Sequence, residues 1–224
     1  MSEGLQIVHI DKALAVVDKP AGLVVHPAPS HQGPTLVDEL AGILGGGDPE
    51  RPGIVHRLDK GTSGLMLVAR GDEPLAALQE AVRERRVERV YLALAGGRIG
   101  SRTGTIDAPI GRAARQRHRM AVSGAASRQA RTHFEVIELL GEETYLEVRL
   151  ETGRTHQIRA HMAAIDHPLV GDPTYGGRER YGLGRPFLHS HRLSFSHPLD
   201  GRLLSFSSPL PRDLAAALAD ARAA

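Results

Sequence analysis

The stretch Gly53–Ala69 reads GIVHRLDKGTSGLMLVA and joins a polar segment to an apolar run. Residues 56–64 are mostly polar, whereas Leu65–Val68 are all apolar, a pattern typical of a turn that leads into a buried strand. Two glycines inside the polar segment allow the backbone to bend sharply just after Asp59. The sequence therefore predicts a bent loop in front of a core strand, with one carboxylate in the loop.

Asp59 is a candidate catalytic nucleophile. Its neighbours Arg57 and Lys60 are cations that favour an ionised carboxylate, and an ionised carboxylate can form a covalent intermediate with an electrophilic carbon. A loop aspartate more often makes a surface salt bridge or an Asx-turn. The local sequence alone leaves both roles open.

Six short runs contain branched apolar residues, as strands of a folded core do. They are Leu5–Ile10, Leu14–Val17, Leu65–Val68, Val90–Leu94, His133–Leu139 and Tyr145–Leu150. Two further segments, RPFLHSHRLSF and GRLLSFSSP, predict a closing hairpin with its turn at residues 197–201.

Four segments predict helices. They are Thr35–Leu44, Glu73–Arg86, Arg154–Ile165 and the Leu- and Ala-rich end of the chain. Asp72 and Asp213 precede two of them and are predicted to be N-caps. Strands outnumber helices and follow one another in meander-like groups. We therefore predict an α+β fold with a mixed, mainly antiparallel sheet and flanking helices.

The composition is that of a globular protein, with 224 residues, 41% hydrophobic residues and no cysteine. The length predicts a single domain over residues 1–224. Lack of cysteine excludes disulfides, thiolate metal sites and a cysteine nucleophile. No apolar run approaches the ~18 residues that a membrane-spanning helix needs, so we expect a cytoplasmic protein without membrane association.

Positive charge is concentrated in one part of the chain. Residues 83–119 contain ten arginines against three acidic residues, a local excess of +7. The segment Arg112–Arg131 overlaps the end of this basic region. Its apolar residues follow no periodic pattern, so it predicts a long basic loop. Because guanidinium groups pair with phosphate oxygens, we expect arginines in the loop to contact the phosphates of a polyanionic partner. The candidates are Arg112, Arg115, Arg117 and Arg119.

Several motifs occur in a characteristic order along the chain. HRLDKGTSGLMLVA at 56–69 resembles the signature HRLD-x-x-T-S-G-L-x-L-x-A of the RluA family of pseudouridine synthases. DKPAGLVVHP at 18–27, RVYLA at 89–93, TGRTHQIRAH at 152–161 and HPLVGDPTY at 167–175 resemble further elements of that family. Arg89 stands where the family usually has lysine. The resemblance covers roughly residues 5–210.

The resemblance implies an isomerase that converts uridine in structured RNA to pseudouridine, with a central active-site cleft. It implies that Asp59 is the nucleophile, that Tyr91 stacks on the target uracil and that Arg159 pairs with Asp59. Arg57 and Arg154 are further candidate substrate-binding residues, Arg154 through a phosphate. The isomerisation needs no redox equivalent and no energy donor, so we expect no cofactor.

The twelve histidines could suggest a metal site. His156 and His161 are five residues apart and would lie on different sides of a helix, whereas zinc-binding pairs are spaced by four. His189 and His191 could share a face of a strand, but no carboxylate accompanies them at ligand spacing. We expect no metal.

Two other functions use the same residues. A nuclease or other hydrolase could use Asp59 with a histidine as general base, and an RNA-binding protein without catalysis could use the basic loop alone. Asp59 in its motif argues against the second. The sequence leaves open whether the RNA is ribosomal or transfer RNA, and whether Asp59 attacks the uracil ring or assists cleavage at C1′. Many family members that act on large ribosomal RNA have an N-terminal S4-type domain. The motifs begin within the first 20 residues here, so we expect no such domain, and we infer no obligate protein partner.

Overall fold

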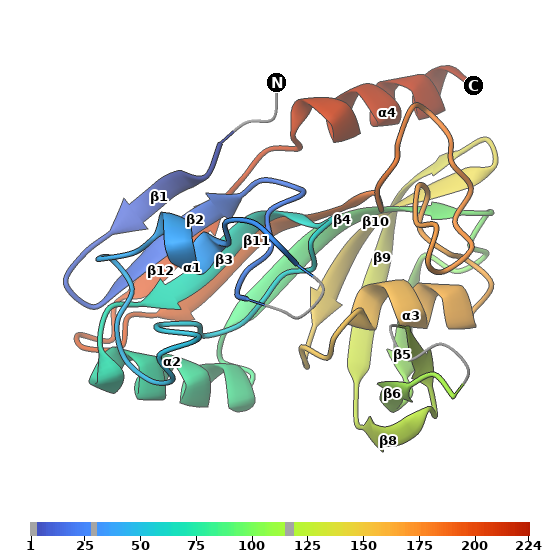
Figure 1. Ribbon diagram of the computed structural model, residues 1–224. Helices are drawn as coiled ribbons and strands as arrows, with labels where there is room; N and C mark the ends of the chain where they lie inside the picture. The colour runs from blue at the N-terminus through green and yellow to red at the C-terminus, as the bar shows by residue number, and fades with distance from the viewer. Residues whose placement is uncertain (1–3, 28–30, 115–118) are drawn as a thin grey trace. The chain divides into compact units, whose positions relative to one another are not determined.

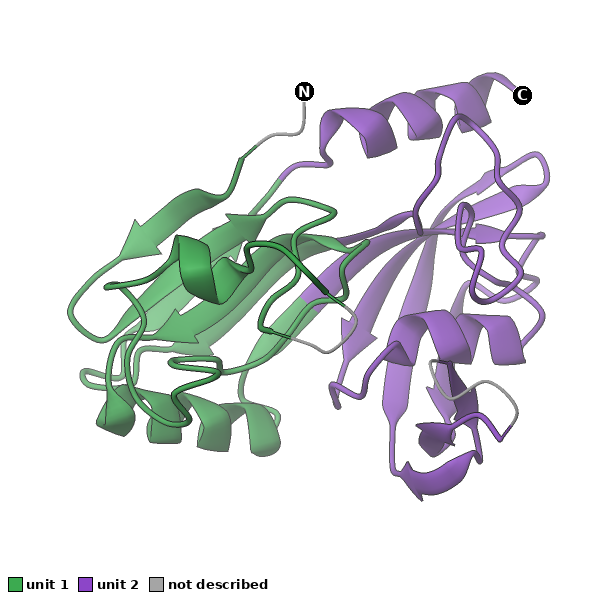
Figure 2. Ribbon diagram, viewed as in Figure 1, with its two compact units in different colours: residues 1–89, 190–208 green, residues 90–189, 209–224 purple. Residues whose placement is uncertain are grey.

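The computed structural model describes residues 4–27, 31–114 and 119–224. The chain divides into two compact units (Figure 2). Unit 1 contains residues 1–89 and 190–208, and unit 2 contains residues 90–189 and 209–224. Two strands, β4 (Glu88–Gly96) and β11 (Leu188–Ser196), have residues in both units. That the whole chain forms one domain stays a prediction.

Unit 1 is built on a sheet (Figure 1), and two of its central strands are buried along almost their whole length. The strand order is β1 (Gln6–Ile10), β2 (Leu14–Lys19), β3 (Ser63–Ala69), β11 and β12 (Leu203–Ser207). The pairs β1–β2, β2–β3 and β11–β12 are antiparallel. Every residue of β3 is buried, which explains why its sequence is a continuous apolar run without alternation.

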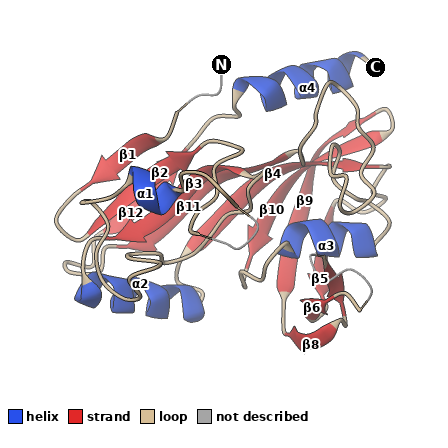
Figure 3. Ribbon diagram, viewed as in Figure 1, coloured by secondary structure: helices blue, strands red, loops and turns tan. Residues whose placement is uncertain are grey.

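Helix α2 (Asp72–Arg83) covers the core of unit 1 with one apolar face. Leu75 and Leu78 of this helix pack with Leu67 and Phe195 of the sheet. The short helix α1 (Leu36–Glu39) begins with a capping box, in which Thr35 and Asp38 bond to each other's backbone amides. Figure 3 shows both helices beside the strands of this unit.

Unit 2 contains a second group of antiparallel strands. Its order is β4, β10 (Glu143–Leu150), β9 (Arg131–Leu140) and β5 (Thr103–Asp107). The C-terminal helix α4 (Arg212–Ala223) packs Leu214 and Leu218 with Leu94, Tyr145 and Phe187. Helix α3 (Gln157–Ala164) lies in the same unit.

A small three-stranded sheet is also part of unit 2. Its order is β7 (Met120–Val122), β6 (Ile110–Arg112) and β8 (Ala125–Arg128), and both pairs are antiparallel. The prediction of a loop over residues 112–131 is therefore wrong for most of the described part of this segment. Strands of three or four residues are too short to show a periodic pattern in the sequence.

All six predicted strand runs lie in or largely overlap strands, and the closing hairpin is confirmed as β11–β12. The two predicted N-caps are wrong. Asp72 is the first residue of α2, and its carboxylate accepts from the Gly47 amide at 2.9 Å. Asp213 lies inside α4 and pairs with Arg185 at 2.6 and 2.9 Å. None of the described helices is long and apolar enough to span a membrane.

Candidate active site

Asp59 lies in a tight turn that is hydrogen-bonded at two points of its backbone. The Thr62 amide donates to the Asp59 carbonyl at 3.1 Å and closes the turn. The Gly22 amide donates to the Lys60 carbonyl at 2.7 Å. Asp59 itself is half-buried. The bend predicted after Asp59 is confirmed, and residues 56–62 are called the aspartate loop below.

Gly64 is the second residue of β3 and lies directly after the aspartate loop. Its φ is +109°, a conformation that residues with a Cβ rarely adopt. A Cβ at this position would lie 2.2 Å from the Ser190 carbonyl oxygen. The Ser190 hydroxyl in turn donates to the Leu65 carbonyl at 2.9 Å. A glycine is thus required for β3 and β11 to approach each other beside the loop.

His56 anchors the other end of the aspartate loop. Its Nε2 accepts a hydrogen bond from the Leu67 amide of β3 at 3.1 Å. Burial, together with the charge of Arg89, lowers the pKa of His56 to about 3. The ring is therefore neutral at physiological pH, and its proton is on Nδ1 because Nε2 accepts. A neutral histidine with one hydrogen bond to a core strand serves as a structural anchor.

A buried cation shapes the turn that contacts the loop. The Lys19 side chain has no exposed surface, and its Nζ donates to the carbonyls of Pro20 and Leu23 at 2.9 Å each. These bonds hold the turn that presents the Gly22 amide to Lys60. The DKPAG motif at 18–22 therefore supports the aspartate loop from a neighbouring position in unit 1.

Arg57 is exposed, as a residue that contacts substrate should be. It lies near His26, since burial and the charges of Arg57 and Arg51 lower the pKa of that histidine. Arg51, Arg57 and His26 of unit 1 therefore lie close to one another, and Arg57 belongs to the aspartate loop. This local positive potential suits an anionic substrate.

Tyr91 lies in β4 of unit 2, opposite Val148 of β10, and is 4% exposed. The strand partner on one side and the buried position restrict the orientation of its ring. Stacking of this ring on a uracil stays a prediction.

Arg159 forms a buried ion pair within unit 2. Its Nε and Nη2 donate to the two carboxylate oxygens of Asp172 at 2.6 and 2.8 Å. The Arg159 side chain is 9% exposed and that of Asp172 is fully buried. Asp172 also accepts from the Thr174 amide at 3.1 Å. Sequence reasoning missed Asp172 as a partner, although it stands in the quoted motif HPLVGDPTY; the pairing of Arg159 with Asp59 stays a prediction.

The turn before α3 is organised by the side chain of Gln157. Its Oε1 accepts from the Thr152 hydroxyl at 2.7 Å and from the Arg154 amide at 3.0 Å. This local bonding explains why α3 begins at Gln157, three residues later than predicted. The Arg154 side chain donates from Nε to the Gln129 carbonyl at 3.0 Å, and burial, with the nearby charge of Arg128, lowers its pKa. Two arginines held this close favour an anion between them.

The structure describes two of the four arginines that were predicted to contact RNA. Arg112 is exposed at the end of β6. Arg119 places its guanidinium 4.8 Å from the centre of the Tyr175 ring. Arg115 and Arg117 lie outside the described residues, so their roles stay predictions.

The histidines considered as metal ligands have other partners. The buried His161 ring bonds to the Thr132 hydroxyl and to the Ala108 carbonyl, both at 2.9 Å. His156 Nδ1 lies 3.2 Å from the Tyr175 hydroxyl. Across the three described ranges, no three histidine or acidic side chains are grouped as a metal site requires.

The family model described as RNA pseudouridylate synthase matches residues 13–164, which include the aspartate loop, Tyr91 and Arg159. The chain belongs to this family. Its members are isomerases that act on RNA, and the resemblance stated from the motifs is confirmed.

Individual relatives agree with this assignment. A protein of Chloroflexus aurantiacus named "Uncharacterized RNA pseudouridine synthase" is 50% identical over 201 residues, which are 88% of this chain and 63% of that protein. "Ribosomal large subunit pseudouridine synthase D" of Pseudomonas aeruginosa is 46% identical over 223 residues, covering 93% of this chain and 69% of the relative. The chain therefore spans about two thirds of the length of these relatives.

The fold also matches a solved member of the family. The structure titled "Human RNA Pseudouridylate Synthase Domain Containing 1" superposes with a TM-score of 0.72 and 29% identity. The match covers 92% of this chain and 84% of that one. The α+β fold with mainly antiparallel strands, of the pseudouridine-synthase type, is confirmed.

Proposed function

We propose that this chain isomerises uridine to pseudouridine in structured RNA and that Asp59 is the nucleophile. The observation that supports this most is the geometry of the aspartate loop. It holds one half-buried carboxylate in a turn fixed by the Gly22–Lys60 and Thr62–Asp59 backbone bonds. A carboxylate held in one place costs little reorganisation when it attacks.

The reaction balances without a co-reactant. The N1–C1′ bond of uridine breaks and a C5–C1′ bond forms. The hydrogen on C5 leaves as a proton, and N1 gains one. Asp59 forms a bond either to the uracil ring or to C1′, and that bond breaks again before product leaves.

Each neighbouring residue has a proposed role. The Tyr91 ring packs against the uracil face, as aromatic side chains do with unstacked bases. Arg159, whose guanidinium is held along one edge by Asp172, pairs with Asp59 and keeps it ionised. Arg57 contacts the substrate from the aspartate loop. No metal or cofactor takes part in the proposed reaction.

Arginines of unit 2 are proposed to bind the RNA backbone. Arg154 and Arg128 lie close enough for their charges to interact and would share a phosphate. Arg112, Arg115, Arg117 and Arg119 would add further phosphate contacts. Extruding a uridine costs a few kcal/mol of stacking, which these contacts offset. Affinity should therefore fall steeply as salt concentration rises.

Large-subunit ribosomal RNA is the proposed substrate, because the Pseudomonas aeruginosa relative carries that substrate in its name. Transfer RNA is the alternative that the sequence also allows. The cytoplasm is the proposed compartment for either.

Transcribed ribosomal RNA and transfer RNA, incubated with wild type or Asp59→Asn, provide the test. Pseudouridine would be mapped chemically at nucleotide resolution. We expect new pseudouridine at defined uridines of the ribosomal transcript with wild type, and none with the variant. Strand cleavage without pseudouridine would favour a nuclease, and binding without either product would favour an RNA-binding protein.

A further inference from the structure

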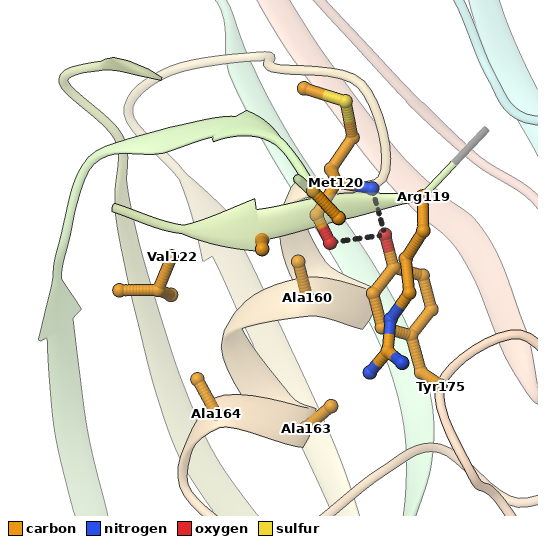
Figure 4. Close-up of a pocket in the computed structure, with 9 residues that line it drawn as sticks. Arg119, Met120, Val122, Ala160, Ala163, Ala164 and Tyr175 are labelled. Atoms are coloured by element: carbon orange, nitrogen blue, oxygen red, sulfur yellow. Dashed lines mark hydrogen bonds between the residues drawn. The ribbon is translucent and has the colours of Figure 1, made fainter. Parts of the chain in front are cut away.

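A pocket of about 440 Å³ lies between strand β7 and helix α3 in unit 2 (Figure 4). Its volume falls within the roughly 300–1,000 Å³ of ligand sites. One wall is formed by Ala160, Ala163 and Ala164 of α3, and the facing wall contains Ala121 and Val122 of β7. The walls are small apolar side chains that leave room for a ligand and offer it no polar group, and this pocket is called the slot below.

The end of this slot is a rigid aromatic side chain. The Tyr175 hydroxyl accepts from the Met120 amide at 3.0 Å and donates to the Met120 carbonyl at 3.1 Å. These two bonds, drawn as dashes in Figure 4, tie β7 to the segment that carries Asp172 and Tyr175. Tyr175 thereby holds the start of β7 in place at one end of the slot.

Arg119 is the cation among the described residues that line the pocket. Its guanidinium lies 4.8 Å from the centre of the Tyr175 ring, and Figure 4 shows it alongside that ring. No carboxylate of the described residues is within salt-bridge distance of Arg119. The pocket thus combines apolar walls with a positive charge, and a ligand that fits both has a flat apolar part and an anionic part.

We infer that this slot binds one unstacked nucleotide of the RNA, separate from the uridine that reacts. The base packs on the alanines of α3 and on the apolar side chains of β7 that line the pocket, and Arg119 contacts its phosphate. Methyl groups on the walls offer no hydrogen bonds, so the slot accepts any base. The inference rests on the proposed function only in taking RNA as the substrate.

The test compares two fluorescent probes of equal charge. One is an oligoadenylate of about ten residues, within the range of single-strand site sizes, and the other is an abasic ribose-phosphate strand of the same length. Adenine cannot be converted to pseudouridine, so turnover does not interfere. Wild type should bind oligoadenylate about tenfold more tightly than the abasic strand, because one base buries apolar surface against the walls of the slot.

Variants separate the two parts of the slot. Ala163→Phe fills it and should reduce the preference for oligoadenylate to about twofold or less, with binding of the abasic strand unchanged. Arg119→Gln should weaken binding of both probes alike, because it removes a phosphate contact. Ala216→Phe adds the same ring to an exposed position of α4 and should leave both affinities as in wild type.

Retention of the full preference by Ala163→Phe, or lack of any preference in wild type, would overturn the inference. If Ala163→Phe does not fold, as judged by circular dichroism, Val122→Phe takes its place, because it fills the slot from the facing wall. The same loss of preference for oligoadenylate is then expected of Val122→Phe. Pseudouridine formation on ribosomal RNA is measured with the same wild-type preparation. Lack of product on this RNA and on transfer RNA would refute the proposed function, whereas a base preference that the filled slot abolishes would still support the slot.

Discussion

Replacing Asp172 with asparagine should destabilise the protein strongly. The Asp172 carboxylate is fully buried and accepts two hydrogen bonds from Arg159 at 2.6 and 2.8 Å. Asparagine keeps the shape and one acceptor, but it removes the negative charge that Asp172 places on the Nε and Nη2 edge of the Arg159 guanidinium. Removing one partner of a buried ion pair costs about 3–5 kcal/mol. Because the amide retains part of the bonding, we expect about 2–4 kcal/mol for this variant.

Urea denaturation followed by circular dichroism measures this change directly. A loss of this size should lower the melting temperature by about 5–15 °C in a chain of this length. Asp220→Asn is the matched control, because Asp220 is exposed on α4 of the same unit. A free energy of unfolding for Asp172→Asn within about 0.5 kcal/mol of the control would refute the reasoning.

Two further predictions concern the aspartate loop and the start of β3 that follows it. Gly64→Ala should be poorly folded or destabilised by several kcal/mol, because its Cβ would lie 2.2 Å from the Ser190 carbonyl oxygen. Gly100→Ala is the control and should be near neutral, since a Cβ at that position would have no atom within 4 Å. Equal stability of the two variants in urea would contradict the account. The second prediction concerns His56, whose pKa in the folded protein is lowered to about 3. Between about pH 3 and 6.5 the imidazole therefore binds a proton in the unfolded chain but not in the folded chain. The free energy of unfolding consequently rises with pH over this window. His56→Gln should make this rise shallower by up to about 1.4 kcal/mol per pH unit. An unchanged slope in pH-dependent urea titrations would disprove the assignment of a neutral His56 in the folded protein.

The strands that carry dense apolar patterns could be predicted from the sequence, and those without such patterns could not. β3 is buried along its whole length, and its run of apolar residues is plain in the sequence. β5 reads TGTID and was missed. Gly104 of β5 lies opposite Phe134, and a Cβ there would be 2.3 Å from the phenylalanine ring. A glycine that makes room for a cross-strand aromatic ring looks like a turn signal when its partner is unknown.

The candidate site was predictable where one continuous motif builds it. The aspartate loop is such a case, since its glycines and the following strand stand in one stretch. Asp172 was not predictable from local pattern, because its ion pair with Arg159 joins residues 13 positions apart through a turn and a helix. Tyr175 is similar, since its two bonds reach Met120, 55 positions away in the sequence. Such partners are chosen by tertiary packing.

The most direct test of the central claim is tritium release from RNA labelled at C5 of uridine. Forming the C5–C1′ bond expels that hydrogen to water, so release reports the chemical step itself. With enzyme in excess over a ribosomal RNA transcript, wild type should release tritium in proportion to the pseudouridine mapped. Asp59→Asn should release it at least about 10⁴-fold more slowly, as expected when a nucleophile is removed. Release by Asp59→Asn within about tenfold of the wild-type rate would contradict the assignment of Asp59 as the nucleophile.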